Sequence, residues 1–139
     1  MTLDKAVILV EQFERGTLPK EKWTHAAHFI MAAWYCAGTP IPEAVEKIRE
    51  GIKRYNVSVG GKNTDSSGYH ETITLFYAMT IARYLITTGV CELTDESLSL
   101  FLAQPFLAHD YILQFYSKEL LMSTTARRSW VEPDRLFCF

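Results

Sequence analysis

The sequence is poor in the features that mark several classes of protein. Its three cysteines, Cys36, Cys91 and Cys138, form an odd set without metal or redox spacing, which argues against a disulfide framework and favours small buried thiols. Basic and acidic residues are nearly balanced, at 14 and 16, with no run of like charges. No basic stripe can therefore neutralise a row of phosphates, and we expect no nucleic-acid partner.

The sequence also shows no sign of a signal peptide or of a transmembrane segment. The first residues lack the charged and apolar regions of a signal peptide, and no apolar run approaches the roughly 20 residues that span a bilayer. A cytoplasmic protein without membrane contact is the resulting expectation. With 139 residues, 48% of them hydrophobic, the chain can bury one core and is too short for two, which predicts a single domain over residues 1–139.

The hydrophobic pattern predicts an all-α fold, a compact bundle-like domain of five to six helices. Apolar residues recur at helical spacing over residues 3–15, 25–37, 42–55, 69–87 and from 95 onward. Thr2 and Thr24 are suitable N-caps, and Gly16 and Gly89 are suitable stops. Segments 25–37 and 69–87 are apolar on most sides, so they are the expected central helices. Beyond Pro105 the pattern breaks into short helical pieces.

Two features interrupt this pattern. Gly51, inside segment 42–55, costs about 1 kcal/mol relative to alanine in a helix, and close packing against another helix would explain it. Residues 56–68 are rich in Gly, Ser, Asn and Asp without periodicity. A polar connection of this length before the fourth helix is typical of a functional or disordered loop. Gly60 and Gly61 would serve as hinges, which suggests a lid.

Three of the four histidines lie within one turn of the starts of the two central helices. The first helix opens with Trp23-Thr24-His25-Ala26-Ala27-His28, and the second with Tyr69-His70-Glu71-Thr72. At about 100° per residue, His25 and His28 share one stripe of their helix. If the two helix starts lie side by side, His25 or His28 should lie within about 8 Å of His70 and form one polar site.

The first interpretation of this site is acid–base catalysis on a small anionic molecule. Histidine titrates near neutral pH, so His70 or His28 could act as general base while Glu71 orients an imidazole. Helix N-termini and Arg127 would hold a carboxylate or phosphate. The residues expected to bind the ligand are His25, Asn63, Tyr69, Thr74 and Arg127.

The second interpretation is a divalent metal such as zinc, held by His25, His28 and His70 with Glu71, water or substrate completing the shell. Three protein ligands and one open position are typical of catalytic zinc, although His-x-x-His is a weak pattern. A third interpretation is a module that binds a ligand or another subunit without turnover, so the sequence leaves open whether the protein is an enzyme. His109 is expected to be a surface or capping residue.

Three blocks in order resemble a bacterial family of small helical proteins of uncharacterised function. They are Trp23-Thr24-His25-x-x-His28, Tyr69-His70-Glu71-Thr72-Ile73-Thr74, and Ser123-x-x-Ala126-Arg127 followed by Pro133-Asp134. The resemblance spans nearly the whole chain and implies that the blocks meet in one pocket, without implying a reaction. The apolar end, Leu136-Phe137-Cys138-Phe139, is expected to dock on the domain or to join subunits of a homo-oligomer.

Overall fold

The computed structural model describes residues 1–136, and over this range it contains seven α-helices, three short 3-10 helices and no β-strand. The α-helices are α1 (Leu3–Arg15), α2 (His25–Cys36), α3 (Ile41–Ser58), α4 (Glu71–Thr87), α5 (Asp95–Leu102), α6 (Lys118–Leu121) and α7 (Thr124–Arg128). The 3-10 helices are η1 (Lys20–Lys22), η2 (Pro105–Leu107) and η3 (Tyr111–Gln114). The predicted all-α, bundle-like fold is confirmed, and the helix number exceeds five to six because short helices follow α5.

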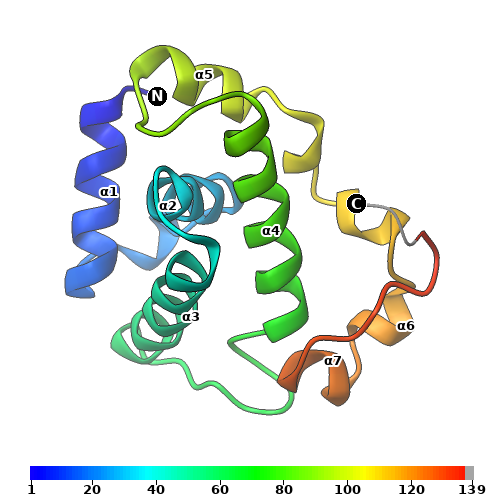
Figure 1. Cartoon of the computed structure of the whole chain (residues 1–139). Coiled ribbons are helices and arrows are strands. Elements are labelled where there is room, and N and C mark those ends of the chain that lie inside the picture. The colour runs from blue at the N-terminus through cyan, green and yellow to red at the C-terminus, as the bar shows by residue number, and fades with distance from the viewer. Residues whose placement is uncertain (137–139) are drawn as a thin grey trace.

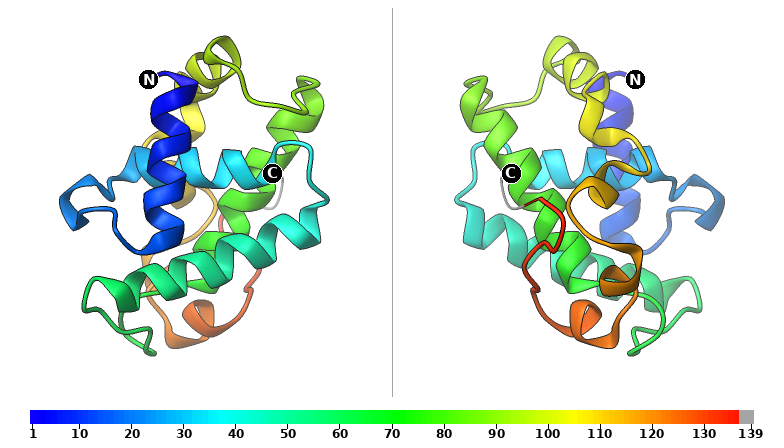
Figure 2. Two further views of the ribbon diagram at one scale, coloured as in Figure 1. Left: turned by 90° about the vertical axis from the view of Figure 1, so that its left-hand side faces the viewer. Right: turned by 90° about the vertical axis from the view of Figure 1, so that its right-hand side faces the viewer.

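Helices α1 to α4 enclose the main core (Figure 1). The α2 helix packs against α1, α3 and α4, and α3 also packs against α4. Figure 2 shows α2 and α3 crossing the molecule one above the other, with α1 upright against them. Eight of the twelve residues of α2 are buried, so its expected central place is confirmed.

A glycine allows α1 and α3 to approach each other. A Cβ atom at Gly51 would lie 2.8 Å from Cε2 and 3.0 Å from Cζ of Phe13, whose ring is fully buried. Atoms that are not bonded to each other do not pack at such distances without displacement. Gly51 therefore serves close helix packing, as its position in the sequence suggested.

Most helix boundaries follow the expected caps, and two differ. Thr2 and Thr24 accept hydrogen bonds from the first turns of α1 and α2, and Gly16 ends α1 with φ 70°. The α3 helix continues to Ser58, so the first three residues of the predicted 56–68 loop are helical. The α4 helix begins at Glu71 and not at residue 69, because His70 is extended, with φ −131° and ψ 110°, and caps the helix.

The segment from η2 onward forms a second layer along α4 (Figure 1). Its own small apolar cluster is centred on Phe76 of α4 and contains Ile112, Phe115, Tyr116 and Leu121. The hydroxyl of Thr72 donates to the carbonyl of Ser129 and accepts from the amide of Val131. These bonds attach the extended residues after α7 to the first turn of α4.

The structure tests the expectations for the cysteines, the apolar tail and membrane spans only in part. Cys36 is buried, and burial raises the pKa of its thiol to about 12. Cys91 is exposed, so the prediction of buried thiols is wrong for it. Cys138 and most of the apolar tail lie outside the described residues, and Leu136 is half exposed. Within residues 1–136, no helix has both the length and the apolar character needed to cross a bilayer.

Candidate functional site

A cavity of about 440 Å³ lies where the main core meets the C-terminal layer. Its walls come from α2, α3, α4 and residues 109–122, and most lining side chains are apolar. The polar or titratable residues in the lining are His25, His28, Thr74, Tyr77, His109 and Lys118. No Asp or Glu lines it. Its volume falls within the range of about 300 to 1,000 Å³ typical of small-molecule sites.

Small residues on two facing helices leave this space open. Ala32 of α2 and Ala78 of α4 both line the cavity and are buried. His25, Phe29 and Ala32 recur at spacings of four and three, which places them on one face of α2. The exposed lining residues His109, Lys118 and Met122 mark the side on which the cavity meets solvent.

Each α2 histidine is held by a bond to a backbone carbonyl. Nε2 of His25 lies 2.7 Å from the Leu107 carbonyl oxygen, and Nδ1 of His28 lies 2.7 Å from that of Thr24. A carbonyl oxygen can only accept a hydrogen bond, so Nε2 of His25 and Nδ1 of His28 carry the hydrogens. In a neutral ring the lone pair then lies on the other nitrogen, Nδ1 of His25 and Nε2 of His28. No buried side-chain nitrogen or oxygen of residues 1–136 lacks a hydrogen-bond partner. The lone-pair nitrogens of both rings have no such partner, so they are accessible to solvent or to a ligand.

Stacking fixes the same two rings from the side. The indole of Trp23 stacks on His28 with the ring centroids 3.8 Å apart, and His109 stacks on His25 at 4.0 Å. Burial lowers the pKa of His28, and the nearby His25 lowers it further, against the opposing hydrogen bond with Thr24. His28 is therefore a neutral imidazole at pH 7.

His70 has a different role from the one expected. Its Nδ1 accepts from the Ile73 amide at 3.2 Å as the N-cap of α4, and its Nε2 donates to the Leu121 carbonyl at 2.7 Å. Both nitrogens are thus occupied, and His70 does not line the cavity. His25 instead stacks on His109, which is exposed, as expected for a surface residue, and also lines the cavity.

The three-histidine metal set gains no support from this geometry. Among residues 1–136, no group of three His, Cys, Asp or Glu side chains is arranged to hold a metal ion. His25 and His28 line the cavity, whereas the ring nitrogens of His70 are engaged with α4 and Leu121.

The other predicted residues of the 63–71 block gather around a second, polar pocket of about 250 Å³. Its lining is Arg49, Lys53, Asn63, Thr64, Asp65, Tyr69, Glu71, Arg127 and Arg128. We call it the polar pocket. Of the residues expected to bind the ligand, it contains Asn63, Tyr69 and Arg127, while Thr74 and His25 line the cavity. The residues that the sequence placed in one site are thus divided between two pockets.

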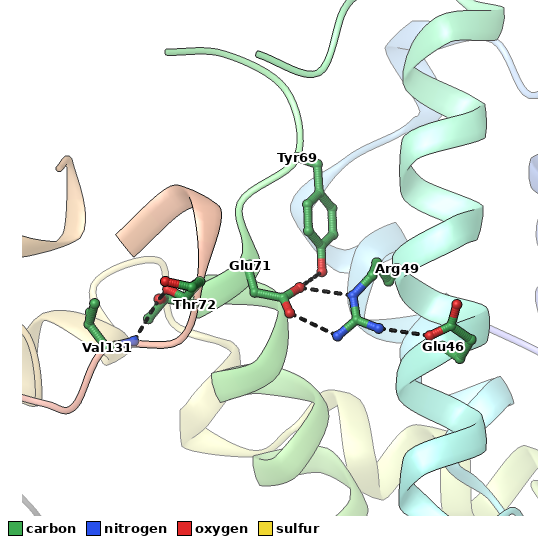
Figure 3. Close-up of polar contacts among 7 residues, drawn as sticks. Glu46, Arg49, Tyr69, Glu71, Thr72 and Val131 are labelled. Carbon is green, nitrogen blue, oxygen red and sulfur yellow. Dashed lines mark hydrogen bonds and ion pairs between the residues drawn. The ribbon is translucent and has the colours of Figure 1, made fainter. Parts of the chain in front are cut away.

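Glu71 is paired with a guanidinium in this pocket (Figure 3). Its carboxylate accepts from Nε and Nη2 of Arg49, at 3.0 and 2.8 Å, and from the Tyr69 hydroxyl at 2.5 Å. Burial alone would raise the pKa of Glu71, but the bonds from Arg49 and Tyr69 outweigh it and hold the pKa below its usual value. Glu71 is therefore an ionised partner of Arg49 and does not orient an imidazole.

The loop before α4 is tied down by side-chain contacts. Asn63 accepts from Asn56 and from the Tyr69 amide, and donates to the Lys53 carbonyl. Arg128 pairs with Asp65 across the loop. The loop lines the polar pocket and contributes no residue to the cavity, so the suggested lid would cover the polar pocket alone.

Arg49, Lys53 and Lys118 were missed by sequence reasoning. The charges of segment 42–55 have a spacing that is typical of a solvated helix face, and Glu43 and Lys47 on that face pair at 3.5 Å. Arg49 lies on the same helix, in the same pattern of alternating charges as Lys47. Only its contact with Glu71, 22 residues away, shows that it belongs to a pocket. Lys118 follows a serine cap and carries no local signal of a cavity.

Comparisons with known proteins give no family and no relative. No protein-family model matches the chain, and neither the curated proteins nor the solved structures contain a significant match.

Proposed function

We propose that this protein binds a small, largely apolar molecule with one acidic group in the cavity between α2, α4 and residues 109–122. The observation that carries the proposal is a cavity of about 440 Å³ whose lining is mostly apolar, contains three histidines and a lysine as its basic residues, and contains no carboxylate. The apolar wall supplies most of the binding free energy, at about 25 cal/mol per Å² of buried apolar surface. The few polar groups fix the orientation of the ligand.

The charge of the lining selects an acidic ligand. The positive charge of Lys118 meets no carboxylate in the lining, and Lys118 forms no ion pair within residues 1–136. An acidic group at the open side would pair with Lys118 and accept hydrogen bonds from the exposed His109. The body of the ligand would then lie against residues such as Phe29 and Ile81.

A matched pair of fluorescent probes tests the proposal directly. Anilinonaphthalene sulfonate and N-phenyl-1-naphthylamine share one apolar body and differ in the sulfonate. We expect saturable binding of both by titration calorimetry, with tighter binding of the sulfonate. Lys118→Ala should weaken the sulfonate by about two- to fivefold and leave the neutral probe unchanged, because an exposed ion pair contributes about 1 kcal/mol or less.

Two variants control this experiment. Lys5→Ala removes an exposed lysine of α1 that lines neither pocket, and it should change neither affinity. Ala32→Leu places three extra carbons in the cavity and should weaken both probes while the circular dichroism spectrum stays helical. Unchanged probe affinity in Ala32→Leu would show that the probes bind elsewhere and would contradict the proposal.

A second candidate function, acid–base catalysis in the same cavity, follows from the state of His28. This ring is neutral, holds its hydrogen on Nδ1 through the Thr24 carbonyl, and presents an unprotonated Nε2 to accessible space. A neutral imidazole with a fixed tautomer suits a general base. The catalytic base would then be His28, with His25 beside it, and His70 would act only as a helix cap.

Turnover is tested by incubating the purified protein with a cell-derived mixture of small molecules, followed by mass spectrometry. Catalysis predicts that an apolar acid disappears and a product appears with the wild-type protein, but not with His28→Gln. A ligand that is retained and recovered unaltered from both proteins would leave the binding module as the function.

A further inference from the structure

We propose that the polar pocket is a second, separate binding site, which takes a phosphate group carried by a small molecule. It is lined by residues of α3, α4, α7 and the loop before α4, and it shares no lining residue with the cavity. The inference is therefore independent of the function proposed for the cavity.

The polar pocket contains more positive than negative side chains. The lining contains four basic residues, Arg49, Lys53, Arg127 and Arg128, and two carboxylates. Arg49 pairs with Glu71 at 2.8 Å, and Arg128 pairs with Asp65. Lys53 and Arg127 have no carboxylate within ion-pair distance in residues 1–136. Two positive charges in one pocket of about 250 Å³ thus have no ion-pair partner among these residues.

Lys53 and Arg127 are also held in place while keeping donors that are free to bind an anion. Nη1 of Arg127 donates to the carbonyls of Gly68 and Tyr69, at 2.9 and 3.3 Å, which leaves Nη2 and Nε without a partner in residues 1–136. The ammonium of Lys53 lies 5.0 Å from the centre of the Tyr69 ring. Donors that are already ordered lose little conformational entropy when they bind an anion.

Hydrogen bonds and ion pairs also join the residues of the pocket walls to one another. The hydroxyl of Tyr69 is bound to Glu71, and Asn63 joins the loop to α3 through the Lys53 carbonyl. Arg49 also pairs with Glu46 at 2.8 Å, so the guanidinium that holds Glu71 is fixed from two sides (Figure 3). Glu71 is therefore neutralised by a partner that is itself held in place, and Asp65 is paired with Arg128 at the exposed rim.

A phosphate group matches these charges better than a carboxylate. A phosphate monoester carries a charge of about −1.5 to −2 at pH 7, whereas a carboxylate carries −1. Arg and Lys are the residues that usually bind phosphate, the first through its planar set of donors and the second as a point charge. Two uncompensated cations are thus neutralised by one phosphate.

Titration calorimetry at constant ionic strength tests the proposal, with inorganic phosphate, methyl phosphate and acetate as probes. We expect saturable binding of both phosphates and much weaker binding of acetate. Tighter binding of methyl phosphate than of inorganic phosphate identifies a phosphorylated small molecule as the occupant, and the reverse order identifies free phosphate. Absence of saturable binding up to roughly 10 mM of either phosphate would overturn the proposal.

Lys53→Gln is the decisive variant, because the side chain of Lys53 has no hydrogen bond or ion pair whose loss would loosen the fold. This substitution should weaken phosphate binding about tenfold or more, as expected for the loss of a charge-assisted hydrogen bond. Lys47→Gln removes a lysine from the same helix that is already paired with Glu43. Equal weakening by both variants would mean a general charge effect and no site. Ala32→Leu, which fills the cavity, should leave phosphate binding unchanged.

Discussion

At the scale of single residues, the contact between Gly51 and Phe13 reverses an ordinary rule. Glycine to alanine in a helix interior normally stabilises by about 1 kcal/mol. Here the added methyl group would meet the Phe13 ring at 2.8 Å. We expect Gly51→Ala to lower the free energy of unfolding by about 1 to 3 kcal/mol in urea titrations. The same change in a Phe13→Leu background should cost less, and an equal cost in both backgrounds would contradict the packing argument.

The pair of Arg49 and Glu71 makes a second prediction at this scale. Their side chains are 24% and 17% exposed, so Glu71→Gln leaves a mostly buried guanidinium with a weaker partner. We expect a loss of about 1 to 3 kcal/mol in the free energy of unfolding, measured by denaturant titration. The matched control is Glu43→Gln, whose pair with Lys47 is more than half exposed and should contribute about 0.5 kcal/mol or less.

At the scale of elements, the start of α4 makes stability depend on pH. His70 caps the helix through an unprotonated Nδ1, and burial lowers its pKa from the usual 6.5, with Arg127 contributing. The unfolded chain therefore binds a proton at a higher pH than the folded chain does. Stability should be constant above about pH 6.5 and should fall as the pH drops from 6.5 toward the folded pKa.

Urea titrations between pH 5 and 8 measure this dependence. His70→Asn keeps a cap acceptor and should flatten the curve, because asparagine does not titrate. His28 also has a lowered pKa, so part of the slope should remain in that variant. A wild-type curve that is flat down to pH 5 would contradict the role assigned to both histidines.

The elements also differ in how far their local sequence predicts them. The starts of α1, α2 and α5 are marked by Thr2, Thr24 and Thr94, whose hydroxyls accept hydrogen bonds from the first turns. The start of α4 has no such threonine or serine at the cap. His70 fills that place: its Nδ1 accepts from the Ile73 amide, and the ring is held by the bond from Nε2 to the Leu121 carbonyl. That contact joins residues far apart in the chain, which is why the α4 boundary was misplaced.

At the scale of the whole molecule, the two sites should act on stability independently. A ligand that binds only the folded state stabilises it by about 2.7 kcal/mol at 100 times its Kd. The cavity and the polar pocket share no lining residue, so saturating anilinonaphthalene sulfonate and methyl phosphate together should raise the melting temperature by the sum of their separate shifts. Differential scanning calorimetry measures the shifts, and a combined shift well below the sum would mean one shared site.

Local patterns in the sequence are enough to predict the helical class, the positions of the long helices and the clustering of polar residues at two helix starts. These follow from contacts three or four residues apart and from caps, which are local. The tertiary structure alone decided which polar groups meet. His25 stacks on His109, Arg49 holds Glu71, and Nε2 of His70 donates to the Leu121 carbonyl, because helix crossing and the path of residues 105–136 bring distant segments together. The single predicted site became an apolar cavity and a polar pocket for this reason.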